Sequence, residues 1–132
     1  MARVFLAVVG LAYWALAAWC SILPETTSAS VGFDLRHGSG QSEYLTVYGG
    51  LEFGLGLIFL WPLWRPETTR FALSACFAIH ASLVLFRSAS FLLYAGIPSM
   101  TYGLAAGEWV LMLTSAALLA RLSHGRQGCV DE

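Results

Sequence analysis

Three charged side chains lie within stretches that are otherwise apolar enough to cross a membrane: Glu52, Arg87 and Glu108. A charge in the hydrocarbon core costs at least about 2.5 kcal/mol, so such a residue normally faces the protein interior or a water-filled cavity. The guanidinium of an arginine can donate hydrogen bonds to two carboxylates at once. We therefore predict an Arg87–Glu108 pair with Glu52 close by, forming a buried polar cluster.

Other polar side chains have the spacing to face the same interior. His80 precedes Arg87 by seven residues, which is two helical turns, so the two side chains share a face. Tyr44, Tyr48 and Glu52 are spaced by four and form one stripe. We predict that these residues line a polar column beside the charged cluster.

We expect a structural role for this set of groups, in a protein that acts by itself or as an accessory subunit of a membrane complex, and keep a binding role as the alternative. In the structural hypothesis the cluster fixes the arrangement of the helices and has no substrate. In the binding hypothesis Glu52 and Tyr48 contact a lipid-like, quinone-like or other apolar small molecule. An enzyme version would have Glu52 or Glu108 transfer a proton while Arg87 stabilises negative charge, but our expectation leans toward a protein that is not an enzyme.

We expect no cofactor and no metal. The three cysteines, Cys20, Cys76 and Cys129, are widely separated and lack the spacing of a redox pair or a zinc site. His37 lies in a polar stretch with no second ligand at a suitable distance in the sequence. We interpret the cysteines as small apolar residues and His37 as a surface residue.

Composition sets the class of protein. The chain has 132 residues, of which 58% are hydrophobic and 11% charged, and this balance is typical of membrane proteins. All seven basic residues are arginine, and no block of them could bind a phosphate backbone, so we expect no nucleic-acid partner. Membrane lipid is the expected surrounding.

Four apolar segments are long enough to span a bilayer, and they predict an all-α, antiparallel bundle of four transmembrane helices in a single domain, 1–132. We expect the first segment to be retained rather than removed as a signal peptide. A polar outer loop, whose VGFDL segment could form a short helix or turn, separates the first two spans. The predicted spans are 4–23, 43–63, 71–94 and 102–122, with the outer loop at 25–42 and a polar tail at 123–132.

The distribution of arginine predicts the orientation. With both termini in the cytoplasm, the inner side receives five arginines and the outer loops receive only Arg36, which satisfies the positive-inside rule. At 1.5 Å per residue, Glu52, Glu108 and Arg87 then lie about 13, 9 and 10 Å from the outer ends of their helices. The inner arginines are Arg3, Arg65, Arg70, Arg121 and Arg126.

Glycines on the second span predict close helix packing. Gly50 and Gly54 form a small-xxx-small pair, and Gly49 and Gly56 narrow the flanks, so we expect another helix to approach there. The matching surface is expected on the third span, at Ser74, Ala75, Ala78, Ala81 and Ser82. A second interpretation is that the glycines leave room for a ligand beside Glu52.

The pattern as a whole resembles a known family. The segment YGGLEFGLG, residues 48–56, is followed by a short Arg-bearing loop, a third helix with Arg87, a turn at Gly96-Ile97-Pro98, and a fourth helix with an early Glu108. It resembles a family of small bacterial four-helix membrane proteins catalogued as a domain of unknown function, and looks like a relative of the DoxX group.

The resemblance implies a multi-pass protein of the bacterial inner, or cytoplasmic, membrane. Some DoxX-like proteins look like small subunits of membrane oxidoreductases, which implies a larger membrane complex as a partner. A more distant similarity of architecture links such bundles to sterol-isomerase-type enzymes and their ligand-binding relatives. A homo-oligomer is a further alternative, since glycine surface unused inside the bundle could pack between subunits.

Overall fold

The computed structural model of the protein describes residues 1–127, and these residues are almost entirely helical. The described chain contains no strand. One segment in the second span is a π-helix, in which hydrogen bonds join residues five apart and the turn is wider than in an α-helix. The elements in order are α1 (Ala2–Ile22), α2 (Pro24–Ser30), α3 (Ser39–Tyr44), the π-helix η1 (Leu45–Leu51), α4 (Glu52–Leu60), the short 3-10 helices η2 (Trp61–Leu63) and η3 (Pro66–Thr68), α5 (Thr69–Leu93) and α6 (Ser99–Gln127).

Four helical stretches are long and apolar enough to cross a membrane, as predicted. Their boundaries differ from the predicted ones because helices continue into polar residues beyond the apolar stretch. The last helix runs to Gln127, five residues past its predicted end. Cys129 and the rest of the predicted tail from 128 onward lie outside the described residues. The four stretches are Ala2–Ile22, Ser39–Leu63, Pro66–Leu93 and Ser99–Ser123.

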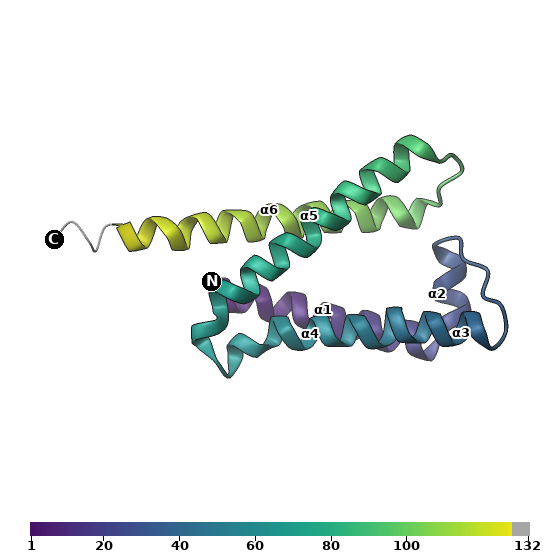
Figure 1. The fold of residues 1–132 in the computed structure, drawn as a ribbon, viewed down its shortest axis with the longest axis horizontal. Coiled ribbons are helices and arrows are strands. Elements are labelled where there is room, and N and C mark those ends of the chain that lie inside the picture. The colour runs from purple at the N-terminus through teal and green to yellow at the C-terminus, as the bar shows by residue number, and fades with distance from the viewer. Residues whose placement is uncertain (128–132) are drawn as a thin grey trace.

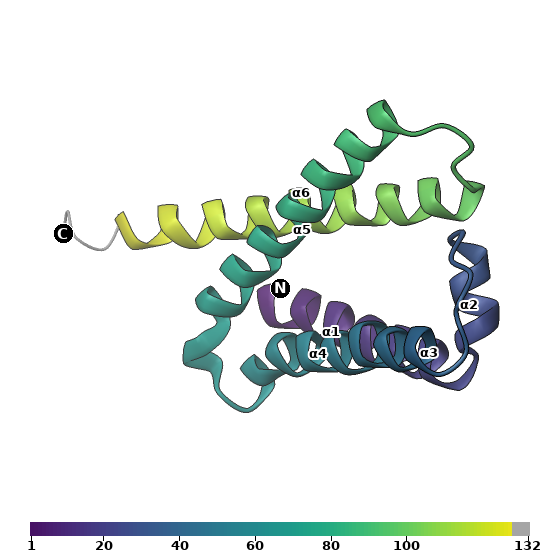
Figure 2. The same cartoon turned by 45° about the vertical axis from the view of Figure 1, so that its right-hand side comes forward.

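The helices form two hairpins rather than one closed bundle. Helix α1 lies along α4 and α5 lies along α6, while contacts between the two pairs are much sparser. Figures 1 and 2 show the two pairs of long helices close together near the α4–α5 connection and farther apart toward the α5–α6 connection, where α2 lies between them. The predicted antiparallel bundle of four helices is therefore not confirmed as one packed unit, because the two hairpins diverge.

The hairpins meet in a small apolar core near the α4–α5 connection. Phe59 from α4 and Leu73 from α5 are fully buried there. Between helices of membrane length such side chains act through close packing rather than through removal from water, so this contact holds the hairpins together at one end. The core consists of Leu6, Val9, Phe59, Ala72, Leu73 and Cys76.

Glycines bring α1 and α4 into close contact, but at other positions than predicted. A Cβ on Gly10 would lie 3.0 Å from the carbonyl oxygen of Gly56, and a Cβ on Gly49 would lie 2.7 Å from Ser21 Oγ. Gly50 and Gly54 face open space. The prediction of a Gly50/Gly54 contact with the third span is wrong, because the helix that packs on this segment is α1 and it meets the other face.

The predicted outer loop contains a helix of its own. Pro24 stands at the first position of α2, where its missing N–H costs nothing, and α1 ends before it at Ile22. The VGFDL segment follows this helix: Val31 and Gly32 form a turn in which Gly32 has a φ of 85°, a conformation suited to glycine. A Cβ on Gly32 would lie 3.7 Å from Pro98, so this turn approaches the α5–α6 connection.

Candidate functional site

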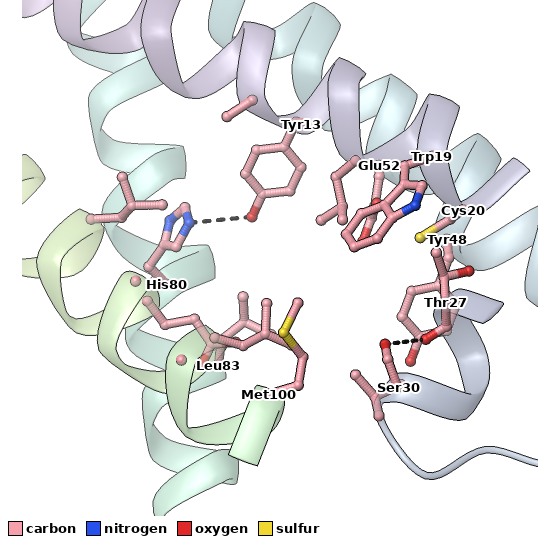
Figure 3. Close-up of a pocket in the computed structure, with 18 of the residues that line it drawn as sticks. Tyr13, Trp19, Cys20, Thr27, Ser30, Tyr48, Glu52, His80, Leu83 and Met100 are labelled. Carbon is pink, nitrogen blue, oxygen red and sulfur yellow. Dashed lines mark hydrogen bonds between the residues drawn. The ribbon is translucent and has the colours of Figure 1, made fainter. Parts of the chain in front are cut away.

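A cavity of about 460 Å³ lies between the two hairpins. This volume is within the range of small-molecule sites. Most of its wall is apolar, and α2 contributes Thr27 and Ser30 at one end (Figure 3). Apolar wall residues include Val8, Val9, Ala12, Leu16, Leu83, Leu104 and Leu111. The cavity exists because the hairpins diverge.

All the residues predicted to form the charged cluster and the polar column line this cavity. Two further polar or aromatic residues of the wall, Tyr13 and Trp19, come from α1 and were not predicted. A phenol at the middle of an uncharged span is a signal that could have found Tyr13, since an interfacial anchor belongs at a span end. The predicted residues in the wall are Tyr44, Tyr48, Glu52, His80, Arg87 and Glu108.

Arg87 and Glu108 form the predicted pair. Arg87 donates from Nε to Glu108 Oε2 and from Nη2 to Glu108 Oε1, both at 2.6 Å. Two parallel hydrogen bonds between a guanidinium and a carboxylate are the strongest common form of this interaction. The pair joins α5 to α6 at the edge of the cavity and neutralises both charges.

Glu52 does not complete the predicted three-residue cluster. No hydrogen bond or ion pair joins it to Arg87 among the described residues, and its Oε2 is buried without a hydrogen-bond partner. The reason is geometric: α4 belongs to one hairpin and Arg87 to the other, and the Arg87 fork already binds a carboxylate on its own hairpin. Glu52 shares the cavity wall with the pair without joining it.

The two tyrosines of the predicted stripe have different roles. The ring of Tyr44 is buried, and its hydroxyl lies 3.1 Å from Thr27 Oγ1 and 3.6 Å from Cys20 Sγ. Tyr48 is half-buried and stacks on Tyr44 with ring centroids 4.5 Å apart. Tyr44 therefore ties the second span to α1 and α2 and supports Tyr48 in the cavity wall.

The π-helix η1 immediately precedes Glu52. Paired glycines, Gly49 and Gly50, lie in this wider turn, and Gly49 is pressed against α1. Turns of this kind occur frequently at functional sites because they change the direction in which following side chains point. The wider turn therefore changes the helix geometry directly before Glu52, the first residue of α4, whose carboxyl lines the cavity.

His80 is buried and connects the two hairpins. Its Nδ1 lies 2.7 Å from the carbonyl oxygen of Cys76 and must donate, because a carbonyl oxygen only accepts. The hydroxyl of Tyr13 lies 3.2 Å from Nε2, and in the neutral tautomer that this network assigns, Tyr13 donates to it (Figure 3). Both ring nitrogens are therefore occupied.

The remaining candidate ligands are scattered. Cys20 and Cys76 are free and buried, and His37 is exposed at the end of the α2–α3 connection. Within residues 1–127, no group of three or more His, Cys, Asp or Glu side chains could hold a metal ion. The chemistry that the cavity offers is hydrogen bonding and charge, centred on Glu52.

Comparison with known proteins identifies a family. A family model described as a domain of unknown function, DUF4345, matches residues 1–119. The chain belongs to this family. The match covers the first three membrane-length helices of this DUF4345 protein and most of the fourth. No curated protein and no solved structure matches the chain. The expected family of unknown function is confirmed, while the relation to the DoxX group stays a prediction.

Proposed function

We propose that the protein binds a small apolar molecule with one polar group in the cavity between its two hairpins. The observation that carries this proposal is the buried Oε2 of Glu52, which has no hydrogen-bond partner and lies in a largely apolar cavity of about 460 Å³. A buried polar atom without a partner costs about 1–3 kcal/mol. A ligand that supplies a donor would remove that cost.

Binding fits the geometry better than catalysis. The enzyme hypothesis needs Arg87 to stabilise charge on a reacting molecule, yet both of its bonded nitrogens face Glu108 at 2.6 Å. Glu108 is likewise committed, which leaves Glu52 as the carboxyl with free hydrogen-bonding capacity. One free carboxyl in an apolar wall suits recognition of a polar group.

We also propose that the chain is a multi-pass protein of a bacterial cytoplasmic membrane with both termini inside. In Figure 1 the N-terminus, the α4–α5 connection and the C-terminal end of α6 lie toward one end of the molecule, with α2 toward the other. Arg65 and Arg70 flank the α4–α5 connection and Arg36 follows α2, which supports the orientation predicted from the arginines.

Labelling from outside the cell tests this orientation. In a Cys129→Ser background, a membrane-impermeant maleimide should label His37→Cys in intact cells and Glu67→Cys only after permeabilisation. Both positions are exposed and the native Cys20 and Cys76 are buried. Labelling of Glu67→Cys alone in intact cells would reverse the orientation.

Native mass spectrometry of the protein purified in maltoside detergent tests the binding proposal. We expect a co-purified apolar molecule on the wild-type protein, less of it on Glu52→Gln, and none on Gly107→Leu. Gly107 lines the cavity and has open space where its Cβ would be, so leucine fills the cavity without a clash at that atom.

Two matched variants control for general effects. Glu43→Gln removes an exposed carboxylate from the same span, and Gly54→Leu adds leucine at a glycine that faces open space but does not line the cavity. Both should retain the ligand. If no variant differs from wild type in bound molecule, and Glu52→Gln alters stability alone, the structural hypothesis replaces binding.

A further inference from the structure

We propose that the ligand of this cavity is a lipophilic amine, bound through a protonated N–H to Glu52. This inference rests on the proposed function and names its ligand class. It comes from three features of the cavity wall: its balance of charge, the free acceptor on Glu52, and the aromatic rings on the same side.

Among the charged groups of the cavity wall, one carboxyl, that of Glu52, has no cation paired with it. Arg87 and Glu108 neutralise each other through two hydrogen bonds. Both nitrogens of His80 are occupied in its neutral form by Cys76 and Tyr13. The other titratable wall residues are hydroxyl and thiol groups that are neutral when protonated. Within the described chain, therefore, no unpaired cation lines the cavity with Glu52, and a ligand with one positive charge balances the cavity.

Glu52 also favours a positively charged group that carries an N–H donor. Its Oε2 is an acceptor without a donor. An N–H on a protonated amine both donates to this oxygen and supplies the missing charge, and such charge-assisted hydrogen bonds are about twice as strong as neutral ones. A hydroxyl would supply the donor alone, and a quaternary ammonium would supply the charge alone.

Aromatic rings line the same side of the cavity as Glu52. Figure 3 shows Trp19, Tyr48 and Glu52 on one side of the cavity, with Leu83 and Met100 across from them. The faces of aromatic rings attract cations, and tryptophan attracts them most strongly. A carboxylate together with aromatic rings is a suitable environment for an ammonium group.

The rest of the wall suits an apolar body. Leu16, Leu83, Leu104 and Leu111 come from three different helices and face the same cavity. Val8 and Trp19 on α1 are 63% and 44% exposed, so the cavity is open along this part of its wall. A hydrocarbon chain on the amine would bury itself against these side chains, and the class of ligand is therefore an amphiphilic amine.

Three probes with the same chain length test this inference: dodecylamine, 1-dodecanol and dodecanoate. Each is titrated into the full-length protein in maltoside micelles, which contain no amine, and binding is measured by native mass spectrometry. We expect dodecylamine to bind about tenfold or more tightly than 1-dodecanol, and dodecanoate to bind weakest because it repels Glu52. In Glu52→Gln the preference for the amine should disappear, while Glu43→Gln should keep it.

A second variant guards against misfolding of Glu52→Gln. Trp19 is substantially exposed, so Trp19→Leu should fold normally and should weaken dodecylamine more than 1-dodecanol. Equal binding of amine and alcohol to wild type would overturn the amine inference and leave the proposed function standing. Binding of all three probes that is unchanged by Gly107→Leu would overturn both.

Discussion

At the scale of single residues, two carboxyl groups that look alike in the sequence differ in their hydrogen bonds within the cavity wall. Glu108 is satisfied by two hydrogen bonds of 2.6 Å from Arg87, whereas Glu52 Oε2 has none. The pair is therefore a structural connection between α5 and α6. Glu52 is the residue that we expect to affect binding.

Removing one partner of the pair should harm the protein more than removing both. We expect Arg87→Met to lower the free energy of unfolding by about 3 kcal/mol, because it leaves Glu108 as an unpaired buried charge. The side chains are 24% and 12% exposed, which places the effect at the lower end of the range for buried pairs. Denaturant titration in micelles, followed by circular dichroism, measures it.

The double variant Arg87→Met/Glu108→Met is the matched comparison. It removes both charges and keeps apolar volume, so it should be more stable than either single variant. A double variant less stable than both singles would mean that the pair contributes net stability, contrary to this expectation.

At the scale of elements, the tightest helix contact is between α1 and α4. Gly10 and Gly56 allow the two backbones to approach, Trp14 donates from Nε1 to the carbonyl oxygen of Phe53 at 3.2 Å, and the rings of these two residues stack at 5.3 Å. Where helices lack a hydrophobic driving force from water, such close packing and interhelical hydrogen bonds hold them together.

Two alanine substitutions on α4 should have opposite effects. A Cβ on Gly56 would collide with the ring of Trp14 and approach the Gly10 carbonyl oxygen, so Gly56→Ala should destabilise the protein by about 1–3 kcal/mol. Gly54 faces open space, so Gly54→Ala should stabilise the helix by up to about 1 kcal/mol. Thermal unfolding in micelles distinguishes them, and equal effects would place α1 on another face of α4.

At the scale of the whole molecule, the hairpins are joined by the apolar core near the α4–α5 connection and by the Tyr13–His80 hydrogen bond, and the turn at Gly32 approaches Pro98 at the other end. Beyond these contacts they diverge around the cavity. A molecule built from two hairpins with few mutual contacts can change the angle between them more easily than a closed bundle can. The Tyr13–His80 hydrogen bond joins the two hairpins, so a change in the angle between them would affect it.

Loss of the Tyr13–His80 hydrogen bond should weaken the contact between the two hairpins. Tyr13→Phe leaves His80 Nε2 without its donor and should cost about 1 kcal/mol. We expect faster hydrogen exchange in the middle of α5, measured by mass spectrometry in micelles. Tyr94→Phe is the control, because Tyr94 is exposed and its side chain makes no hydrogen bond to another residue of the described chain. Unchanged exchange in Tyr13→Phe would show that the core alone sets the angle.

The amino-acid sequence by itself determined the four membrane-length helices and the Arg87–Glu108 pair. Apolar segments of about 20 residues allow little other than a helix in hydrocarbon, since every backbone group must be satisfied within the segment. Arg87 and Glu108 lie on consecutive helices joined by a short turn, so their depths had to match. These features depend on local pattern and on chain connectivity.

The tertiary structure alone decided which helices pack together, and therefore what Glu52 meets. The second span was expected to pack on the third, yet α4 packs on α1 through Gly10, Gly56 and Trp14, and this places α4 in the hairpin opposite Arg87. Several faces of the second span carry small residues, and the spacing of Gly49, Gly50, Gly54 and Gly56 does not choose among them. The choice depends on the shape of a helix distant in the sequence, and it leaves Glu52 facing a cavity instead of an arginine.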